Sequence, residues 1–574
     1  MLLLVGVCLF HFTRNVQTGA PSTDAMDTVQ VARRVAGGGG LSTNVIRPLV
    51  LRYVRPNADG SVPDTAHAPL YPILAGMTMK LRGQDGPGQG DRMAALLSLV
   101  LFVASLFACY LLARRLFGTS GALLSCLLYA LGANALTIAI EPGPVTLATT
   151  LFTLLLLALI GLDSAAGARL GRAVLAGALF GLLFLTIYSS LILLVPILVY
   201  VYVVTRRSYG AMVAFVVTAL LLASPLLLRN WRVTESHNPF FNARLLELMM
   251  QTETFPGYAL YRTLGTPQTL GEYLASGGAG ELLRKLSSNV LGYYVNAPYS
   301  FGILVLPLFL VAALTRFTNP QVNRIRFLVY VLLGLHVLGL SLFVPFRDGL
   351  ALLMIYLPFA TIIGTTFFLN FIRARNLPPF YARAMITAWI LFACIPGIVQ
   401  LFPTQPRTST VYQVFPFLLS NVAGQSSATL LASDLPWEVA FRTGMPALWL
   451  PNDSSEFRAA EDRLGRQVTG IVLTPSMLGA YGGDPSVTAW RSLYVRLGSL
   501  LLTASYLDAV AQRQLLSTNL RYPAEIGEIL VNYEPPRPIP ELQGTTYSLF
   551  WKVRSGSEAQ AAAPAAEAAG GRDS

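Results

Sequence analysis

Long runs of apolar residues, separated by short polar breaks, are the main pattern along this chain. A run of about 17–25 mostly apolar residues can cross a bilayer as a helix. After an N-terminal run at about 1–13, such runs lie at 93–113, 119–140, 143–162, 173–188, 190–205, 209–228, 299–315, 325–345, 349–372 and 380–401. The pattern therefore predicts a polytopic α-helical membrane protein with about eleven transmembrane helices.

Two polar segments, 14–92 and 229–298, are too long to be simple connections between these helices. Each contains an amphipathic stretch, at 67–80 and 281–294, that we expect to lie at the membrane interface. We therefore expect both segments to form structure outside the bilayer.

The pattern changes at about residue 403, where short apolar runs begin to alternate with amphipathic stretches. Strands are expected at 428–433, 447–451 and 469–475, and helices at 437–444, 455–466 and 487–499. We therefore divide the chain into a membrane domain at 1–402, a small α/β domain at 403–554, and an Ala/Gly/Glu-rich tail at 555–574 that we expect to be disordered.

Composition supports a membrane protein. The chain is 54% hydrophobic and 12% charged, with a mean hydropathy of +0.56, whereas a soluble domain carries about 25% charged residues. A net charge of +12 would indicate nucleic acid in a soluble domain, but in a membrane protein the positions of the charges matter more, so no nucleic acid is expected. All four cysteines lie in apolar runs without metal-ligand spacing. The first residues lack a charged n-region and a clear cleavage site, so a first transmembrane helix starting near or upstream of Met1 fits better than a signal peptide.

The arginines predict which side of the membrane each loop faces. They concentrate in alternate loops, which the positive-inside rule places in the cytoplasm: Arg114, Arg115, Arg169, Arg172, Arg206, Arg207, Arg316, Arg324, Arg326, Arg373, Arg375 and Arg383. The segments 14–92 and 229–298, Glu141 and the C-terminal domain then share the outer face. The Arg- and Ala-rich composition is typical of a bacterial inner membrane protein.

Candidate acids lie on this outer face. Ser22 and Thr23 are good N-caps, and Asp24 and Asp27 follow in the first turn, where the helix dipole favours ionised carboxylates. Asp24 is the candidate general base and Asp27 the near alternative. Glu141 stands in a very short outer hairpin, where acids are rare and often functional. A capped surface helix and a solvated loop acid are the ordinary alternatives.

Four residues are candidates for binding a lipid phosphate. His67 and Tyr71 lie around two prolines near the expected water–lipid boundary, and Arg229 and Arg347 lie at outer ends of spans, against the positive-inside pattern. The alternatives are an interfacial turn with a tyrosine anchor and arginines that extend to the headgroups.

The order of these features resembles the GT-C superfamily of integral membrane glycosyltransferases that use polyprenyl-phosphate sugars. It includes protein O-mannosyltransferases, aminoarabinose transferases and RgtA-like enzymes. The family pattern D-E-x-x-Y-x-x-x-A-R is similar to DAMDTVQVAR at 24–33, with Ala25 replacing the second acid and Thr28 the tyrosine. The family's K-P-P-L-Y resembles HAPLY at 67–71, and its P-x-x-L-R-N matches PLLLRN at 225–230.

The resemblance, which covers about residues 1–400, implies an inverting transfer of a sugar at the outer face. Asp24 would act as base on a lipid, glycan or protein acceptor, while Arg229, with His67 or Arg347, would stabilise the leaving polyprenyl phosphate. A divalent metal, Mg²⁺ or Mn²⁺, could bridge Asp24, Asp27 or Glu141 to the phosphate, since some relatives use one and others do not. The alternatives from other classes are a lipid-linked-substrate transporter or flippase and a non-catalytic scaffold in envelope assembly.

Overall fold

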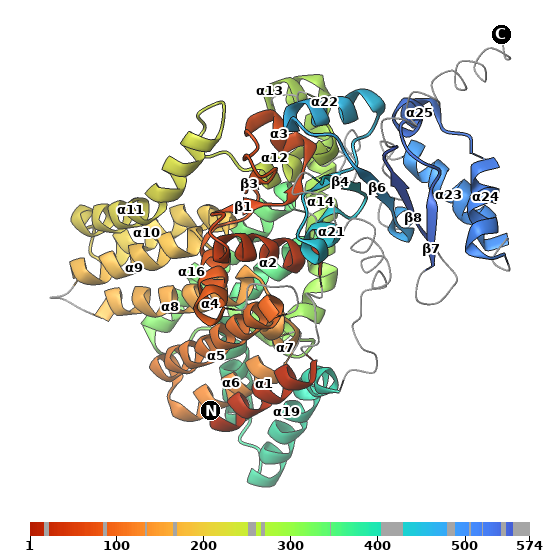
Figure 1. Cartoon of the computed structure of the whole chain (residues 1–574). Coiled ribbons are helices and arrows are strands. Elements are labelled where there is room, and N and C mark those ends of the chain that lie inside the picture. Colours follow the sequence, from red (N-terminus) through yellow and green to blue (C-terminus); the bar gives the residue numbers. More distant parts are fainter. Residues whose placement is uncertain are drawn as a thin grey trace.

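The computed structural model shows a large body of helices with a mixed sheet at one end (Figure 1). The described residues are 1–15, 22–83, 89–132, 135–164, 169–250, 260–265, 270–344, 346–402, 429–478, 488–503, 507–518, 520–540 and 547–554. The tail at 555–574 and the stretch 403–428 lie outside this description.

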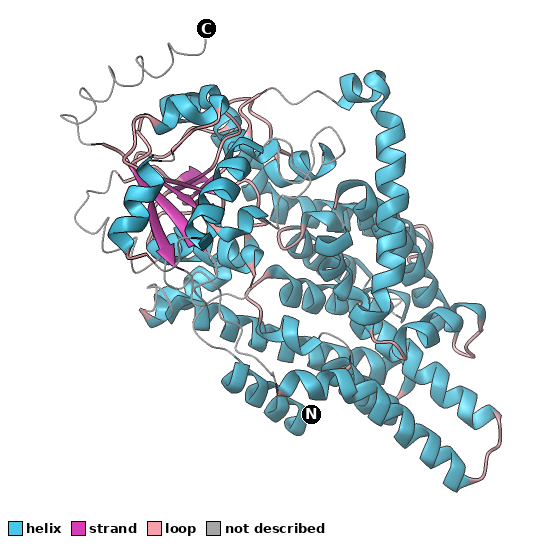
Figure 2. Cartoon of the chain, turned by 90° about the vertical axis from the view of Figure 1, so that its right-hand side faces the viewer, coloured by secondary structure: helices cyan, strands magenta, loops and turns pink. Residues whose placement is uncertain are grey.

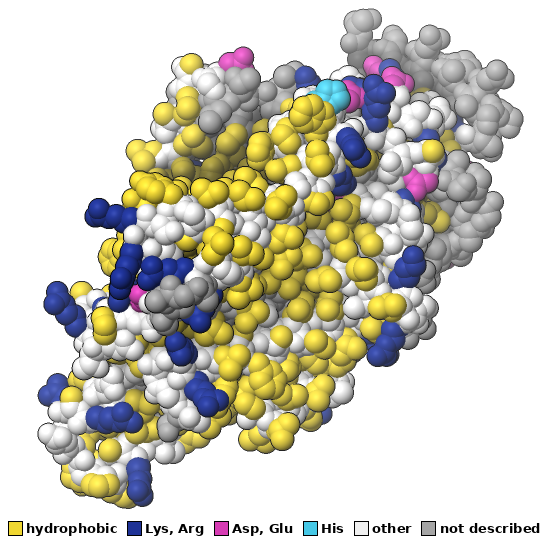
Figure 3. All heavy atoms as spheres, turned by 90° about the vertical axis from the view of Figure 1, so that its left-hand side faces the viewer, with side chains coloured by type: hydrophobic (Ala, Val, Ile, Leu, Met, Phe, Trp, Pro, Cys, Tyr) yellow, Lys and Arg dark blue, Asp and Glu magenta, His cyan; other side chains and the backbone are white. Residues whose placement is uncertain are grey.

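Six helical segments among the described residues are long and apolar enough to cross a membrane. They are α5 (Gln89–Phe117), α8 (Pro144–Ser164), α11 (Tyr209–Val233), α16 (Pro320–Phe343), α19 (Pro379–Leu401) and the continuous segment Gly349–Ala374, which joins α17 (Phe346–Leu353), η5 (Met354–Tyr356) and α18 (Leu357–Ala374). On the face drawn in Figure 3, hydrophobic side chains cover a broad area, with Lys and Arg side chains mainly toward its margins. The chain is a multi-pass membrane protein, as predicted.

The predicted count of about eleven spans is not confirmed, because several apolar runs are broken or short. The run 119–140 divides into α6 (Thr119–Leu131) and α7 (Ala135–Ile140), and the run 173–188 contributes only the 16 residues of α9 (Arg169–Phe184). The run 190–205 starts as a 3-10 turn, η1 (Tyr188–Leu193), before α10 (Leu194–Val204). Pro196 has no N–H to donate to the carbonyl four residues earlier, so a regular helix cannot pass through this point without losing a hydrogen bond.

The predicted span 299–315 is wrong as a single helix. α14 (Ala279–Phe301) ends at Gly302, whose φ of 93° interrupts the helix, and α15 (Val305–Val311) continues after a bend of 117°. The expected amphipathic helix at 281–294 lies within α14, and its location at the membrane interface stays a prediction.

Close helix contacts rely on glycines. A Cβ on Gly177 of α9 would lie 2.3 Å from the carbonyl oxygen of Phe215 in α11, and one on Gly181 would lie 3.0 Å from that of Ala219. The two glycines form a GxxxG pattern on one face of α9, which lets two membrane helices approach closely where water provides no hydrophobic force between them.

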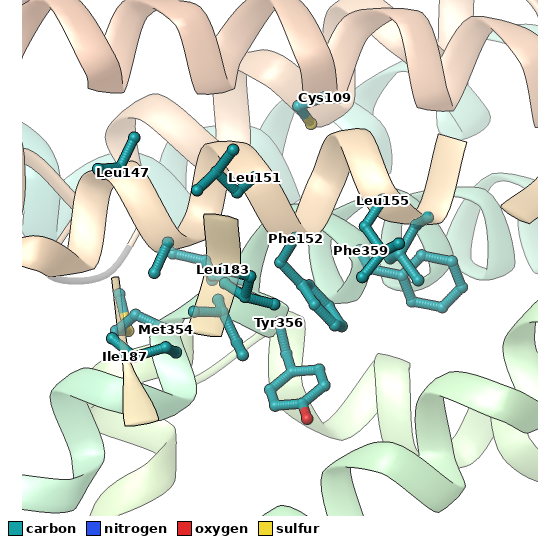
Figure 4. Close-up of a cluster of buried hydrophobic side chains, with 14 of the residues drawn as sticks. Cys109, Leu147, Leu151, Phe152, Leu155, Leu183, Ile187, Met354, Tyr356 and Phe359 are labelled. Carbon is teal, nitrogen blue, oxygen red and sulfur yellow. The ribbon is translucent and has the colours of Figure 1, made fainter. Parts of the chain in front are cut away.

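Larger side chains fill the space between the other helices. Phe152 of α8 meets Tyr356 of η5 edge to face, with 5.0 Å between ring centroids (Figure 4). Leu151, Leu155 and Leu183 surround this pair, and all five side chains are buried. The helices around them therefore form a rigid base beneath the outer segments.

The first polar segment, 14–92, which we call the first outer segment, has regular structure in its described part. It contains α2 (Thr23–Ala36), β1 (Ser42–Thr43), β2 (Val45–Ile46), α3 (Pro48–Tyr53), β3 (Val62–Pro63) and α4 (Leu70–Arg82). β1 and β3 pair antiparallel, and α4 packs against α2 and α5. The helix expected at 67–80 is thus α4, with one face buried against protein.

The C-terminal region has the predicted α/β character. Its elements are β4 (Leu431–Ser433), α21 (Pro436–Thr443), β5 (Ala447–Trp449), α22 (Ser454–Leu464), β6 (Gly470–Leu473), α23 (Thr488–Thr503), α24 (Ala509–Thr518), α25 (Ala524–Leu530), β7 (Arg537–Pro540) and β8 (Tyr547–Lys552). The sheet order is β2-β5-β4-β6-β8-β7, with β2, β5, β4 and β6 parallel and the last two strands antiparallel to their neighbours (Figure 2).

The edge strand β2 comes from the first outer segment, so the sheet is not built from the C-terminal region alone. Val45 and Ile46 pair with Ala447 and Leu448 of β5. The same joint is strengthened by α21, which packs on α2, and by Arg33, whose Nη1 donates to the carbonyl oxygen of Phe441 at 2.5 Å. The sheet is therefore fixed to the helix that carries Asp24.

Candidate active site

Ser22 fixes the start of α2 above the membrane helices. Its Oγ accepts a hydrogen bond from the backbone N–H of Ala25 at 3.2 Å, and it donates to Oε1 of Glu141 at 2.6 Å. The predicted N-cap thus also ties α2 to the short turn between α7 and α8. Asp24 follows in the first turn of the helix, as the sequence predicted.

A cavity of about 520 Å³ lies beside this helix start. Its polar side includes Asp24, His67, Glu141 and Arg244. Its apolar side includes Leu191, Ile192, Leu340, Phe343, Val344 and Leu352, from η1, α16 and α17 and their ends. The cavity could hold an amphipathic molecule with a charged group near Asp24 and a hydrocarbon chain toward the helices.

Asp24 forms an ion pair inside this cavity. Its Oδ2 lies 3.1 Å from Nη2 of Arg244, and the two side chains are 67% and 32% exposed. The guanidinium of Arg244 lowers the pKa of the Asp24 carboxyl, and the charges of His67 and Arg47 act in the same direction. Asp24 is therefore an ionised carboxylate at neutral pH.

Asp27 faces the protein interior, although its spacing of three residues from Asp24 would place both carboxylates near one face of the helix. It is buried in an ion pair with Arg47, and it does not line the cavity. The side chains at 25–32 of α2 are all buried, because α4, α5 and α21 cover most of the helix, whereas Asp24 is exposed at its start. This arrangement disfavours Asp27 as the alternative base.

His67 joins two carboxylates. Its Nδ1 lies 3.1 Å from Oδ2 of Asp64, and its Nε2 lies 3.5 Å from Oδ2 of Asp27. With Arg47, two carboxylates then face one permanent cation, and the cluster is neutral only when the imidazole is protonated. Burial by itself lowers the pKa of His67, but the charges of Asp64 and Asp27 outweigh burial and raise it. The charged form of His67, which lines the cavity, is therefore favoured.

Asp64 is held as an anion in this cluster. Its burial by itself raises the pKa, but His67, the backbone N–H of Ala66 and Arg47 lower the Asp64 pKa to about 2. The Ala66 N–H donates to Oδ1 at 3.0 Å. Asp64 therefore orients the imidazole and supports its charge.

Tyr71 and Arg229 are not among the described residues that line the cavity. Tyr71 is fully buried, where its hydroxyl donates to the carbonyl oxygen of Ala94 at 3.0 Å and lies 2.7 Å from Oγ of Ser98. The side chain of Tyr71 is therefore not an exposed interfacial anchor, because α4 packs this face against α5, and its depth near the water–lipid boundary stays a prediction. Arg229, in α11, donates to the carbonyl oxygen of Leu41 at 2.6 Å. Arg347 lies in α17, but its side chain is outside the described part of the structure.

Arg47, Asp64 and Arg244 were not identified from the sequence. Asp64 stands three residues before His67, a spacing that could have indicated the pair. Arg244 comes from α12 (Ala243–Met250) in the second outer segment, 220 residues from Asp24. Nothing in the local sequence of either residue indicates their contact.

The three acids considered as metal ligands do not form one ligand set. Asp24 faces Arg244, Asp27 faces Arg47, and Glu141 accepts the hydroxyl of Ser22. Among the residues that the structure describes, no group of three or more His, Cys, Asp or Glu side chains is arranged to hold a metal ion. The residues present do not fit the Mg²⁺ or Mn²⁺ site considered from the sequence, so we derive no step through a metal.

Comparison with known proteins identifies a family match and a shared fold. Residues 66–229 match the family described as dolichyl-phosphate-mannose-protein mannosyltransferase. No curated protein sequence matches the chain.

Solved structures extend the likeness to most of the chain. The oligosaccharyltransferase of Archaeoglobus fulgidus in complex with Zn and sulfate aligns with a TM-score of 0.50 at 10% identity, covering 95% of this chain and 72% of that one. The same enzyme, AglB, in complex with an inhibitory peptide and a dolichol-phosphate aligns with a TM-score of 0.50 at 12% identity, covering 86% and 72%. ArnT from Cupriavidus metallidurans bound to undecaprenyl phosphate gives a TM-score of 0.40 at 14% identity, covering 84% and 94%. The chain therefore shares its fold with this membrane oligosaccharyltransferase, and its residues 66–229 match the mannosyltransferase family, in line with the GT-C resemblance drawn from its sequence.

Proposed function

We propose that the chain is an inverting glycosyltransferase that moves a sugar from a polyprenyl-phosphate donor to an acceptor at the outer face of the membrane. The observation that carries this proposal is the cavity, whose lining combines the polar side chains of Asp24 and His67 with aliphatic and aromatic side chains. A polyprenyl phosphate likewise combines a charged group with a hydrocarbon chain. The dolichol-phosphate bound by the archaeal oligosaccharyltransferase supports this donor class.

Asp24 is the proposed base. A hydroxyl or amine of the acceptor attacks the anomeric carbon, and its proton passes to the Asp24 carboxylate as the new bond forms. The bond between the anomeric carbon and the phosphate oxygen breaks, and the electron pair leaves with the polyprenyl phosphate. A single displacement of this kind inverts the configuration at the anomeric carbon.

His67 is the proposed partner of the leaving phosphate. Its protonated ring lines the cavity, and Asp64 and Asp27 keep it charged. A fixed cation at this position would stabilise the negative charge that develops on the phosphate. Arg229 and Arg347 remain candidate contacts for the same group.

We further propose that the membrane domain (1–402) and the α/β domain (403–554) have separate roles. The cavity lining comes from residues 24–352, and the described residues of 429–554 contribute none of it. The α/β domain instead supports α2 through β2 and α21. The distribution of arginines supports an extracytoplasmic position for the cavity and this domain, in a bacterial inner membrane.

The test measures sugar release from a panel of polyprenyl-phosphate sugars by the full chain in lipid nanodiscs, with membrane extract as the acceptor source. We expect one donor to be turned over, and Asp24→Asn to reduce the rate by about 100-fold or more, the usual worth of a general base. Asp462→Asn, an exposed carboxylate on α22, is the control and should keep the wild-type rate.

Two outcomes would overturn parts of the proposal. Full activity in Asp24→Asn would exclude this residue as base. If the wild type bound none of the donors in the panel and released sugar from none of them, polyprenyl-phosphate sugars would be excluded as the donor class.

A further inference from the structure

Hydrogen bonds fix the start of α12, and so they fix Arg244 beside Asp24, the candidate base. The backbone N–H of Ala243 donates to the carbonyl oxygen of Thr65 at 3.3 Å, two residues before His67. Oδ1 of Asn242 accepts from the N–H of Leu245 at 2.7 Å. α12 therefore begins at the edge of the cavity, and both Asn242 and Arg244 line it.

The Arg244–Asp24 pair occupies the polar side of the cavity, where the proposed donor phosphate would lie. Both side chains are accessible to solvent, so the pair is worth little to the fold and can exchange partners. A phosphate offers the guanidinium two acceptor oxygens, as a carboxylate does; the phosphodiester of the donor carries one charge and the monoester product up to two, so both can compete with Asp24 for Arg244.

We propose that the phosphate of the donor displaces Asp24 from Arg244, so that donor binding itself releases the base. The inference rests on the function proposed above and adds Arg244 as a residue that binds substrate and controls Asp24. Before binding, the guanidinium neutralises the carboxylate and holds it away from an acceptor. After binding, Arg244 contacts the phosphate, and Asp24 can accept a proton.

The proposed exchange of partners by Arg244 predicts how Asp24 affects the binding of a lipid phosphate when no sugar is transferred. Undecaprenyl phosphate, as a product-like probe, must compete with Asp24 for Arg244 in the wild type. Asp24→Asn removes the competitor and should tighten binding by about two- to fivefold, which is the usual worth of an exposed ion pair. Weaker binding of undecaprenyl phosphate by Asp24→Asn than by the wild type would contradict the exchange.

Simple repulsion between Asp24 and the phosphate would also tighten binding in Asp24→Asn, and a double-mutant cycle separates the two explanations. If Arg244 is exchanged, Arg244→Gln weakens binding, and adding Asp24→Asn to it changes affinity much less than in the wild-type background. If repulsion dominates, Asp24→Asn tightens binding at least as much in the Arg244→Gln background, because the guanidinium no longer screens the charge.

The experiment titrates undecaprenyl phosphate into the full chain in nanodiscs and measures its dissociation constant for the wild type, Asp24→Asn, Arg244→Gln, Arg244→Lys and the double variant. Arg244→Lys keeps the charge and should retain part of the affinity. Arg458→Gln is the matched control, since Arg458 pairs with the equally exposed carboxylate of Glu528 and lies on α22, and it should change nothing.

The outcomes distinguish this inference from the proposed function. An equal effect of Asp24→Asn in both backgrounds, with clear binding by the wild type, overturns the exchange and leaves the donor class intact. No binding of undecaprenyl phosphate by the wild type or any variant overturns both.

Discussion

Nδ1 of His67 lies 3.1 Å from Oδ2 of Asp64, and both side chains are buried, so a loop of four residues contains a nearly dry ion pair. The pair depends on a turn in which Asp64 also accepts the N–H of Ala66. Asp27 and Arg47 approach the same imidazole from α2 and from the residue before α3. The charge that His67 shows to the cavity is therefore a property of the folded outer segment.

The stability of this cluster should depend on pH in a defined window. The pKa of folded His67 is raised above its ordinary 6.5, so its contribution is complete below about pH 6.5 and is lost as pH rises through the folded value. The pKa of Asp64 is lowered from 3.8 to about 2, so its contribution is present above 3.8 and is lost as pH falls toward 2. We expect the melting temperature in detergent to fall on the alkaline side in the wild type.

His67→Gln supplies the comparison for this pH dependence. Its melting temperature should be lower than that of the wild type near pH 6 and should change less on the alkaline side, because a glutamine does not titrate. His67→Lys carries a fixed charge, as the related family motif does at this position, and should keep donor binding to higher pH than the wild type. Equal alkaline curves for His67→Gln and the wild type would exclude His67 as the titrating group.

Glu141 and Asp24 line the same cavity, but we expect their amide variants to differ sharply. Glu141 accepts the hydroxyl of Ser22, and the amide oxygen of a glutamine can accept the same hydrogen bond. Glu141→Gln should therefore lose far less than the roughly 100- to 10,000-fold expected for removing a general base, whereas Asp24→Asn should show such a loss. Initial rates of sugar release measure both. Inactivity of Glu141→Gln with normal melting would instead assign the proton transfer to Glu141.

Ser22 combines two roles that substitutions can separate. Ser22→Thr keeps the cap and the donated hydroxyl and should behave as the wild type. Ser22→Ala loses both and should cost about 1 kcal/mol of stability together with activity, because the first turn carrying Asp24 loosens. Ser22→Asp can still cap the helix but places a second carboxylate against Glu141. Its activity should therefore fall strongly while its melting temperature falls little. Wild-type activity in the aspartate variant, with a loss in the alanine variant, would show that only the cap matters.

The sequence predicted the parts of the site that follow local patterns. Asp24 lies in the first turn after a serine N-cap, and His67 lies in a motif-like turn, so each could be recognised from a few neighbouring residues. Arg244 could not, because its contact with Asp24 joins residues 220 positions apart and depends on how α12 is held against Thr65. The burial of Asp27 could not be predicted either, because helical spacing gives angles around a helix but not which sides other elements cover.

In the fold, too, the features that follow local sequence patterns could be predicted, whereas those that depend on distant contacts or on single residues could not. Apolar runs predicted the membrane helices, and alternating short strands and helices predicted the α/β region. The bend at Gly302 depends on a single residue in a run that is otherwise apolar enough to continue. β2 has two residues, Val45 and Ile46, and exists as a strand only because β5 offers an edge to pair with.

The buried pair of Asp27 and Arg47 should be more important for stability than for the chemistry of transfer. Arg47→Met removes the permanent cation and leaves the buried Asp27 carboxylate with only His67, 3.5 Å away, as a cationic neighbour, which should cost about 3 kcal/mol. Asp27→Asn with Arg47→Met removes both charges and should recover much of that loss. Melting curves of the single and double variants measure this coupling. Additive losses would show that the pair contributes no specific stabilisation.

Gly76 of α4 should be essential because it faces the helix that carries Asp24. A Cβ at this position would lie 2.6 Å from the backbone oxygen of Ala32 and 2.8 Å from the Val35 side chain, so Gly76→Ala must push α2 and α4 apart. We expect lower melting and a large loss of transfer, since a displacement of α2 moves Asp24 relative to His67. Gly171 of α9 is the matched control, because a Cβ there meets nothing within 4 Å and alanine is the better helix former. Normal activity in Gly76→Ala would mean that α2 can shift without disturbing the site, which contradicts a base held by the rigid contact of these two helices.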